Sequence, residues 1–252
     1  MKDYSTPIGI RRHIHLTETL STNLFIQENR EKLALKDCSV VSAEYQTAGR
    51  GQRGNSWEAT SGENLLFSIL LEPSFLAAKE QFYISKLIAV SIQEVLSHYL
   101  QGVTIKWPND IYWNQQKIAG ILIEHELEGT QLTSSIIGVG LNVNQRVFHS
   151  GAPNPVSLRQ IIGKKIARRT LLTRILQQVV THYSELKRAS YTLLDESYQS
   201  LLFAREEWRS FQDKNGIFEG KIVGTNPLGQ LLIYDRSMTL HPYAFKEVSY
   251  IL

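Results

Sequence analysis

The hydrophobic pattern along the chain predicts both strands and helices. Leu65–Leu71 reads LLFSILL, an unbroken apolar run of strand length that is typical of a strand covered on both faces. Residues 75–100 repeat apolar side chains at helical spacing, which predicts a long amphipathic helix. Ser21 or Thr22 is suited to cap another helix that continues to about residue 33.

Shorter segments complete this pattern. The sequence predicts strands at 40–45, 103–107, 111–113, 117–124 and 133–143, the last interrupted by two glycines, and helices at 170–189 and 195–209. From about Phe211 the pattern changes to short strands at 217–223, 231–234 and 246–252, and Asn226-Pro-Leu-Gly229 fits a type I turn. We therefore expect an α+β domain over residues 1–210, followed by a small β-barrel-like domain over residues 211–252.

Length and composition agree with this division and narrow the function classes. At about 150 residues per domain, 252 residues form one large domain with a small appendage. A content of 42% hydrophobic residues excludes a disordered or fibrous chain, and a net charge of +3 is too small for affinity built on phosphate neutralisation along a nucleic acid. The single Cys38 and the absence of an apolar leader or membrane-length run predict a cytoplasmic protein without a membrane partner.

Residues 46–57, QTAGRGQRGNSW, form the most informative segment. Its three glycines allow backbone N–H groups to approach an anion closely, and Arg50 and Arg53 add charge and forked donors. The spacing is neither that of a Walker A loop nor that of a dinucleotide-binding loop that opens a helix. Taken alone, the segment is equally compatible with a solvated surface loop.

A second segment reads Lys106-Trp-Pro-Asn-Asp110 and is followed by Lys117-Ile-Ala-Gly. A hairpin between the predicted strands brings Lys106, Asp110 and Lys117 into one small volume, where they can bind a carboxylate or phosphate and offer a base. The alternative for the pentapeptide alone is a surface ion pair beside a proline turn.

Two further segments have both structural and functional interpretations. Gly138-Val-Gly-Leu-Asn142 places two glycines where a ligand packs closely on a strand, or where a β-bulge lies. The run Ser21-Thr22-Asn23 is explained by helix capping, but also suits a small polar heterocycle. The seven histidines show no HExxH or similar spacing, so we expect no fixed metal site in the protein.

The order and spacing of these motifs, STN, QTAGRGxxGxxW, KWPND, KIAG and GxGxN before a short C-terminal β domain, closely resemble those of biotin–protein ligases, also called biotin–[acetyl-CoA-carboxylase] ligases. The resemblance implies a mixed β-sheet catalytic domain packed with helices, plus a small C-terminal SH3-like β-barrel. It also implies that ATP and Mg²⁺ convert biotin to biotinyl-5′-AMP, and that the biotinyl group then passes to one lysine of a biotin carboxyl carrier domain. A homodimer is compatible with this activity.

The resemblance also implies site residues. The catalytic candidates are Lys117, Asp110, Arg50 and Lys106. Biotin would contact Ser21, Thr22, Asn23, Gln46, Gly49, Arg50, Gly51, Lys117, Gly120, Ile121 and Gly138. The nucleotide would contact Gln52, Arg53, Gly54, Asn55, Trp57, Asn109, Lys117 and Asn142.

Physical reasoning supports both halves of such a reaction. A biotin carboxylate and an α-phosphate repel each other, so cations have to gather where they meet, and Lys117 with Arg50 and the loop amides is the candidate set. An acceptor lysine with a pKa of about 10.4 is only about one part in a thousand neutral near pH 7.4. A carboxylate that takes its proton therefore matters, and we expect Asp110, positioned by Asn109, in that role, with Lys106 orienting a phosphate or Asp110.

This chain also departs from the commonest family pattern. Gln52 and Asn55 stand where arginines are frequent, and Leu20 stands where an aspartate commonly precedes STN. Two cations that help to retain the adenylate are therefore missing. Some seventeen residues before Glu18 are too few for the winged helix of the family's transcriptional repressors, so we expect no repressor function. A lipoate–protein ligase, a non-catalytic ligand-binding regulator and a nucleic-acid-binding protein are the competing interpretations.

Overall fold

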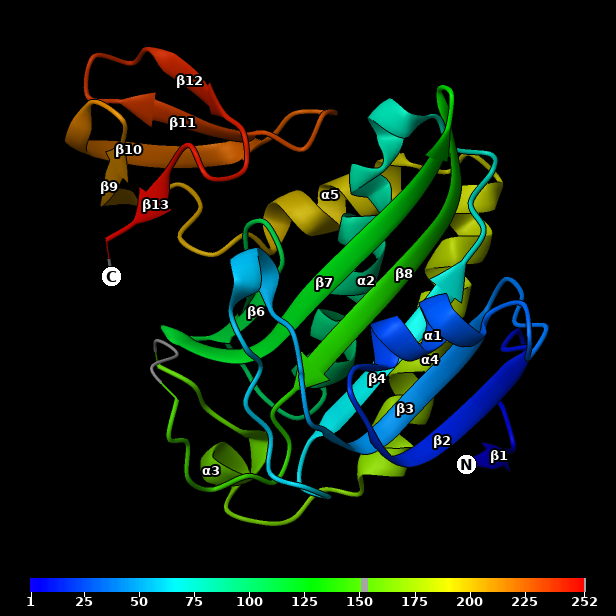
Figure 1. Ribbon diagram of the computed structural model, residues 1–252. Coiled ribbons are helices and arrows are strands. Elements are labelled where there is room, and N and C mark those ends of the chain that lie inside the picture. The colour runs from blue at the N-terminus through cyan, green and yellow to red at the C-terminus, as the bar shows by residue number, and fades with distance from the viewer. Residues whose placement is uncertain (151–153, 252) are drawn as a thin grey trace.

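The computed structural model describes residues 1–150 and 154–251, except for the side chain of Arg53. Its main feature is an eight-stranded sheet with the order β1-β2-β3-β4-β8-β7-β6-β5 (Figure 1). The strands are β1 (Lys2–Tyr4), β2 (Arg12–Thr19), β3 (Ser39–Gln46), β4 (Leu65–Leu71), β5 (Val103–Lys106), β6 (Asp110–Trp113), β7 (Gln116–Glu128) and β8 (Gln131–Leu141). β2 and β3 are parallel and the other neighbours antiparallel, so the sheet is mixed, as expected.

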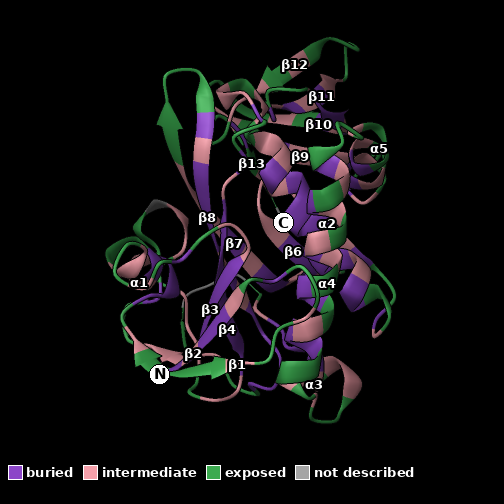
Figure 2. Cartoon of the chain, turned by 90° about the vertical axis from the view of Figure 1, so that its right-hand side faces the viewer, coloured by how far each residue is buried: buried purple, intermediate pink, exposed green. Residues whose placement is uncertain are grey.

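Helices cover both faces of this sheet. The helices α2 (Phe82–Ser97) and α4 (Arg168–Lys187) pack side by side on one face, over a large apolar core that includes the fully buried β4. The short helix α1 (Thr22–Asn29) lies on the opposite face, over β3, β4 and β8, with a second, smaller core. Figure 2 shows the buried strands between these layers. The site described below lies on the α1 face.

The C-terminal part forms a second sheet after α3 (Leu158–Ile162) and α5 (Thr192–Ser200). Its strands β9 (Trp208–Asp213), β10 (Gly216–Thr225), β11 (Leu231–Asp235), β12 (Leu240–Tyr243) and β13 (Ser249–Tyr250) are antiparallel in the order β12-β11-β10-β9-β13. In the described residues β12 and β13 do not pair, so the barrel-like sheet is open. The predicted turn is present, because the Gly229 N–H donates to the Asn226 carbonyl at 2.9 Å.

Several elements of the structure differ from those predicted from the sequence. The helix predicted over 195–209 ends at Ser200, and Trp208 already begins β9, because the edge strand β5 pairs with the chain after α5: the Ile105 N–H donates to the Leu201 carbonyl at 2.8 Å. Of the predicted strand 246–252, residues 249–250 form β13, and Leu252 lies outside the described residues. The proposed domain boundary at residue 210 stays a prediction. It falls inside β9.

Other differences follow from local packing and pairing. The helix expected to reach residue 33 ends at Asn29. Of the helix expected over residues 75–100, only Phe82–Ser97 (α2) is α-helical. The strands β1, β2, β9 and β12 and the helix α3 were not predicted. The two glycines do not interrupt β8, which is paired on both sides through them. No described helix has the length and apolar character to cross a membrane.

Candidate active site

A cavity of about 720 Å³ opens on the α1 face of the large sheet. Its walls come from the start of α1, the loop after β3, the β5–β6 hairpin and the middle of β7 and β8. The lining includes seventeen of the residues proposed from the sequence: Ser21, Thr22, Asn23, Gln46, Arg50, Gly51, Gln52, Asn55, Trp57, Lys106, Asn109, Asp110, Lys117, Gly120, Ile121, Gly138 and Asn142. Phe245 also lines this cavity, so segments more than 200 residues apart in the sequence meet in one concave site.

One end of the cavity carries a closed network of polar side chains. The Thr22 N–H donates to Gln46 Oε1 at 2.8 Å, and the Thr22 hydroxyl lies 3.0 Å from the same oxygen. The buried Ser68 hydroxyl of β4 lies 2.6 Å from both Thr22 Oγ1 and Asn23 Oδ1. Ser21 does not cap α1 through its side chain, contrary to one expectation. The polar groups at this end are thus oriented by one another.

Asn23 extends this network to β7 and to the loop. Its Nδ2 donates to Glu124 Oε2 at 2.6 Å, and Arg50 Nη2 lies 3.5 Å from Glu124 Oε1. A Cβ atom at Gly138 would lie 2.5 Å from Asn23 Oδ1, so a side chain there would displace the asparagine. Gly138 is therefore a close-packing position in β8 and marks no bulge.

The β5–β6 hairpin and β7 bring charged groups to the middle of the cavity. Lys106 and Asp110 are direct partners across the hairpin, and Lys117 Nζ lies 2.7 Å from Asp110 Oδ1. The sequence-based expectation that Lys106, Asp110 and Lys117 share one small volume is met. Asn109 does not orient Asp110 as expected: its side-chain amide donates to the Ile121 carbonyl, because β7 runs past the hairpin at that point.

Lys106 lies between aromatic rings. Its Nζ donates to Tyr112 Oη at 3.1 Å and lies 4.7 Å and 4.8 Å from the ring centroids of Tyr112 and Tyr250. Burial lowers the pKa of Lys106; Asp110 opposes this effect and Lys117 adds to it. The aromatic rings provide favourable contacts for an ammonium group in this half-buried position.

The other end of the cavity is built around Trp57. Its indole lies across Gly120 of β7 and Gly140 of β8, where a Cβ atom would lie 2.8 Å and 2.3 Å from indole carbons. Trp57 Nε1 and Asn142 Oδ1 are buried and have no hydrogen-bond partner among the described residues. Since buried polar atoms are normally paired, these two atoms mark the places where a ligand is expected to bind.

The loop after β3 is folded back on itself. The Trp57 N–H donates to the Gly49 carbonyl at 2.9 Å and the Gly51 N–H to the Asn55 carbonyl at 2.6 Å, around a 3₁₀ turn over Gln52–Gly54. Gly49 and Gly54 belong to this loop but do not line the cavity. The side chain of Arg53, a predicted nucleotide contact, lies outside the described part of the structure.

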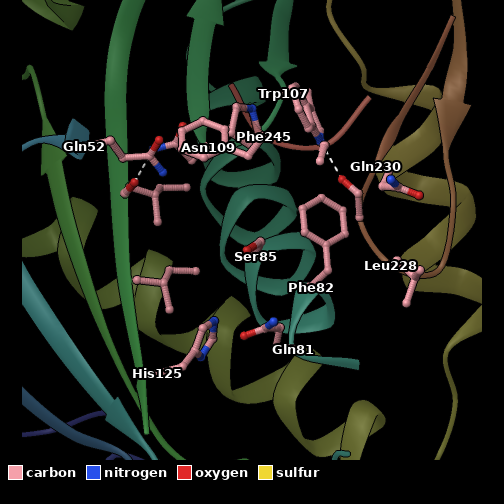
Figure 3. Close-up of a pocket in the computed structure, with 15 residues that line it drawn as sticks. Gln52, Gln81, Phe82, Ser85, Trp107, Asn109, His125, Leu228, Gln230 and Phe245 are labelled. Carbon is pink, nitrogen blue, oxygen red and sulfur yellow. Dashed lines mark hydrogen bonds between the residues drawn. The ribbon is translucent and has the colours of Figure 1, made fainter. Parts of the chain in front are cut away.

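A second, smaller cavity of about 250 Å³ adjoins the first, and Figure 3 shows the side chains that line it. It lies between the start of α2 and the C-terminal sheet, and shares Gln52, Asn109 and Ile121 with the main cavity. Trp107 Nε1 donates to the Gly229 carbonyl at 2.9 Å here, a contact drawn in Figure 3. Trp107 is buried, as expected for a core residue, and also links the two sheets.

The sequence-based reasoning missed Ser68, Glu124 and Tyr250. Ser68 is the one polar residue in an apolar run, and Glu124 is a charge on the inner part of a strand; these signals were present but unspecific. Nothing local to Tyr250 signals its contact with Lys106, because the two are 144 residues apart. No cluster of three or more metal-ligating side chains occurs among the described residues.

Comparisons with known proteins agree with this geometry. The family model described as "Biotin/lipoate A/B protein ligase family" matches residues 15–142. The chain is 33% identical over 204 residues to the bifunctional ligase/repressor BirA of Bacillus subtilis, covering 77% of this chain and 61% of that one. It is 31% identical over 138 residues to a biotin–[acetyl-CoA-carboxylase] ligase of Paracoccus denitrificans, covering 52% and 57%. The chain thus spans about six tenths of the curated relatives it matches.

A solved structure extends the likeness to nearly the whole chain. The biotin protein ligase of Aquifex aeolicus in complex with biotin and ATP superposes with a TM-score of 0.78 at 27% identity, covering 95% of this chain and 98% of that one. The match includes the C-terminal sheet, which lies beyond the residues of the family model.

Proposed function

Because the chain belongs to the biotin/lipoate A/B protein ligase family, we propose that it is an ATP-dependent biotin–protein ligase. The observation that carries the proposal is the Lys117–Asp110 pair, which lines the same cavity as the closed polar network and as the unpaired Trp57 and Asn142 atoms, with Lys117 Nζ 5.5 Å from the Trp57 ring centroid. The structural relative from Aquifex aeolicus binds biotin and ATP, which supports the same two substrates here.

The first half-reaction joins the two substrates. The ring of biotin lies at the Thr22–Gln46 end, where a donor and an acceptor suit a ureido group, and its tail runs towards Lys117 over the side chains of Asn23 and Trp57 that cover Gly138 and Gly120. ATP lies at the Trp57 end. Lys117 and Arg50 neutralise the biotin carboxylate and the α-phosphate, and the carboxylate oxygen displaces pyrophosphate to give biotinyl-5′-AMP.

The second half-reaction transfers the biotinyl group. The ε-amine of an acceptor lysine attacks the acyl carbon, AMP leaves, and Asp110 takes the proton of the attacking amine. Asp110 is already 2.7 Å from one ammonium group, that of Lys117. That contact is to Oδ1, and we expect the other carboxylate oxygen to accept the proton of the acceptor lysine.

Mg²⁺ fits this site as a companion of ATP. Magnesium is commonly held by one or two carboxylates together with substrate phosphates. The described lining offers Asp110 and Glu58, and no larger cluster of ligands. When bound, the ion would neutralise phosphate charge, and Asp110 or Glu58 would hold it.

The direct test incubates the protein with biotin, Mg·ATP and a biotin carboxyl carrier domain. We expect biotin-dependent pyrophosphate release and streptavidin-reactive carrier. Lipoic acid in place of biotin is the control, because the family also includes lipoate–protein ligases. The proposal fails if biotin gives no pyrophosphate and no labelled carrier.

The remaining expectations concern partners. We propose a carboxyl carrier domain as acceptor and the cytoplasm as the place of action. Absence of repressor function and formation of a homodimer stay predictions. Gel-shift assays with biotin operator DNA and light scattering with and without ligands check them.

A further inference from the structure

The C-terminal strand β13 reaches Lys106, a residue that lines the main cavity, from the far end of the sequence. Tyr250 pairs with Phe211 of β9, and their rings lie 5.3 Å apart. Its ring also approaches Phe203 at 6.0 Å, and Phe203 approaches Tyr112 at 5.5 Å. Tyr112, Phe203 and Tyr250 thus form one aromatic cluster beside Lys106, which we call the lysine cage.

Backbone contacts fix this cage to the strand that carries Lys106. The Ile105 N–H donates to the Leu201 carbonyl and the Phe203 N–H donates to the Ile105 carbonyl, both at 2.8 Å. The segment that leads into the C-terminal sheet is therefore paired with β5 immediately before Lys106. Movement of the C-terminal sheet would act on this lysine through both the backbone and the rings.

We propose that Tyr250 is a positioning residue for the ligase reaction: its ring holds the Lys106 ammonium beside Asp110 and couples the C-terminal sheet to the active site. This inference rests on the proposed function. Lys106 Nζ lies nearly equally far from the ring centroids of Tyr112 and Tyr250, 4.7 Å and 4.8 Å, so both rings contact it. The other charged groups that act on Lys106 are Asp110 and Lys117.

The position of Lys106 has a chemical consequence. Lys117 is paired with Asp110 at 2.7 Å, whereas Lys106, although opposite Asp110 in the hairpin, donates to Tyr112 Oη. A cation held by rings keeps its charge without forming a second ion pair with Asp110. Lys106 therefore adds positive potential for the phosphate and leaves a carboxylate oxygen of Asp110 for the acceptor amine.

The test compares Tyr250→Leu, which removes the ring, with Tyr250→Phe, which keeps it. We expect the leucine variant to lower kcat for biotin-dependent pyrophosphate release about fivefold, the equivalent of about 1 kcal/mol, with a smaller change in KM for biotin. The phenylalanine variant should retain wild-type rates. Tyr243→Leu, in β12 at a position that lines neither cavity, is the matched control for general weakening of the C-terminal sheet, because Tyr243 also stacks on a ring, that of Phe218.

Two readouts separate positioning from a merely structural role. In Lys106→Met, adding Tyr250→Leu should have no further effect, since the ring then has no ammonium to hold. In the ¹³C-labelled lysine spectrum, the Lys106 ε-methylene signal should be shifted upfield by the rings in the wild type and in Tyr250→Phe, and less so in Tyr250→Leu. If Tyr250→Leu does not fold, Tyr250→Met fills the space without a π face and replaces it.

Several results would overturn the proposal. These are an unchanged Lys106 signal or rate in Tyr250→Leu, an equal loss in Tyr243→Leu, or additive losses with Lys106→Met. The spectrum requires no ligase activity. A wild type that makes no biotinyl-AMP would therefore overturn the proposed function and the catalytic part of this inference, while the spectrum still decides whether the cage exists.

Discussion

The two ends of the main cavity differ in how far their polar atoms are already paired. At the α1 end, Thr22, Gln46, Ser68, Asn23 and Glu124 form a continuous chain of hydrogen bonds within the protein. At the other end, buried polar atoms of an indole and an asparagine have no partner among the described residues.

This difference suggests two kinds of binding. A network whose members orient one another keeps its shape without a ligand, which lowers the entropic cost of binding there. A buried polar atom without a hydrogen-bond partner lowers the stability of the protein. A ligand that pairs with the polar atoms at the Trp57 end would remove this free-energy penalty. We therefore expect biotin to enter a prepared site, and ATP to complete an incomplete one.

The largest expected effect is at the Lys117–Asp110 ion pair, next to Trp57. Lys117→Ala removes the cation that both the carboxylate and the α-phosphate need, so biotin-dependent pyrophosphate release should fall by at least about a hundredfold. Lys165→Ala, at an exposed position outside the lining, is the control and should behave as wild type. A Lys117→Ala enzyme with near-normal adenylate formation would show that the two ends do not depend on this cation.

Asp110→Asn should affect the second half-reaction. The amide has the shape of the carboxylate but cannot take the proton, so single-turnover transfer from preformed biotinyl-AMP should slow by about a hundredfold. Raising the pH should narrow this deficit, since a larger fraction of the acceptor lysine is then neutral without a base. Wild-type transfer rates in the variant, or a deficit that does not change with pH, would remove Asp110 from the base role.

Two single-methyl substitutions test the difference between the ends directly. A methyl at Gly138 would push on Asn23 at 2.5 Å, and one at Gly140 on Trp57 at 2.3 Å. We expect Gly138→Ala to raise KM for biotin about tenfold with little effect on ATP, and Gly140→Ala to do the reverse, because displacing a packed side chain costs about 1–2 kcal/mol. Each variant is the control for the other, and steady-state kinetics with one substrate varied at a time measures both. Equal effects on both substrates in both variants would show that the two ends are not separate sites.

The sequence was sufficient to find these lining residues but not their interactions. The sequence shows Gly138 and Gly140 as closely spaced glycines in a strand. The side chains that pack on them, Asn23 and Trp57, come from α1 and from the loop after β3, which are distant in the sequence. The pairing of Asn109 with the Ile121 carbonyl, in place of Asp110, also follows from the path of β7. Local patterns gave the positions of strands such as β4 correctly. β1 and β12 are short edge strands and β2 is half polar, so no local pattern identifies their pairing partners.

The smallest expected effect concerns a cation that this chain lacks. Gln52 lines the cavity at its boundary with the second cavity, where the commonest family pattern has an arginine. Gln52→Arg should slow the release of biotinyl-AMP by up to about fivefold, because a partly exposed ion pair contributes about 1 kcal/mol or less. Gln81→Arg, which lines only the second cavity, adds the same charge nearby and should leave the off-rate unchanged. The off-rate is measured by chasing labelled adenylate with excess biotin and ATP. An equal off-rate in wild type and Gln52→Arg would mean that Arg50, already linked through Glu124 to the prepared end, retains the intermediate without a second cation.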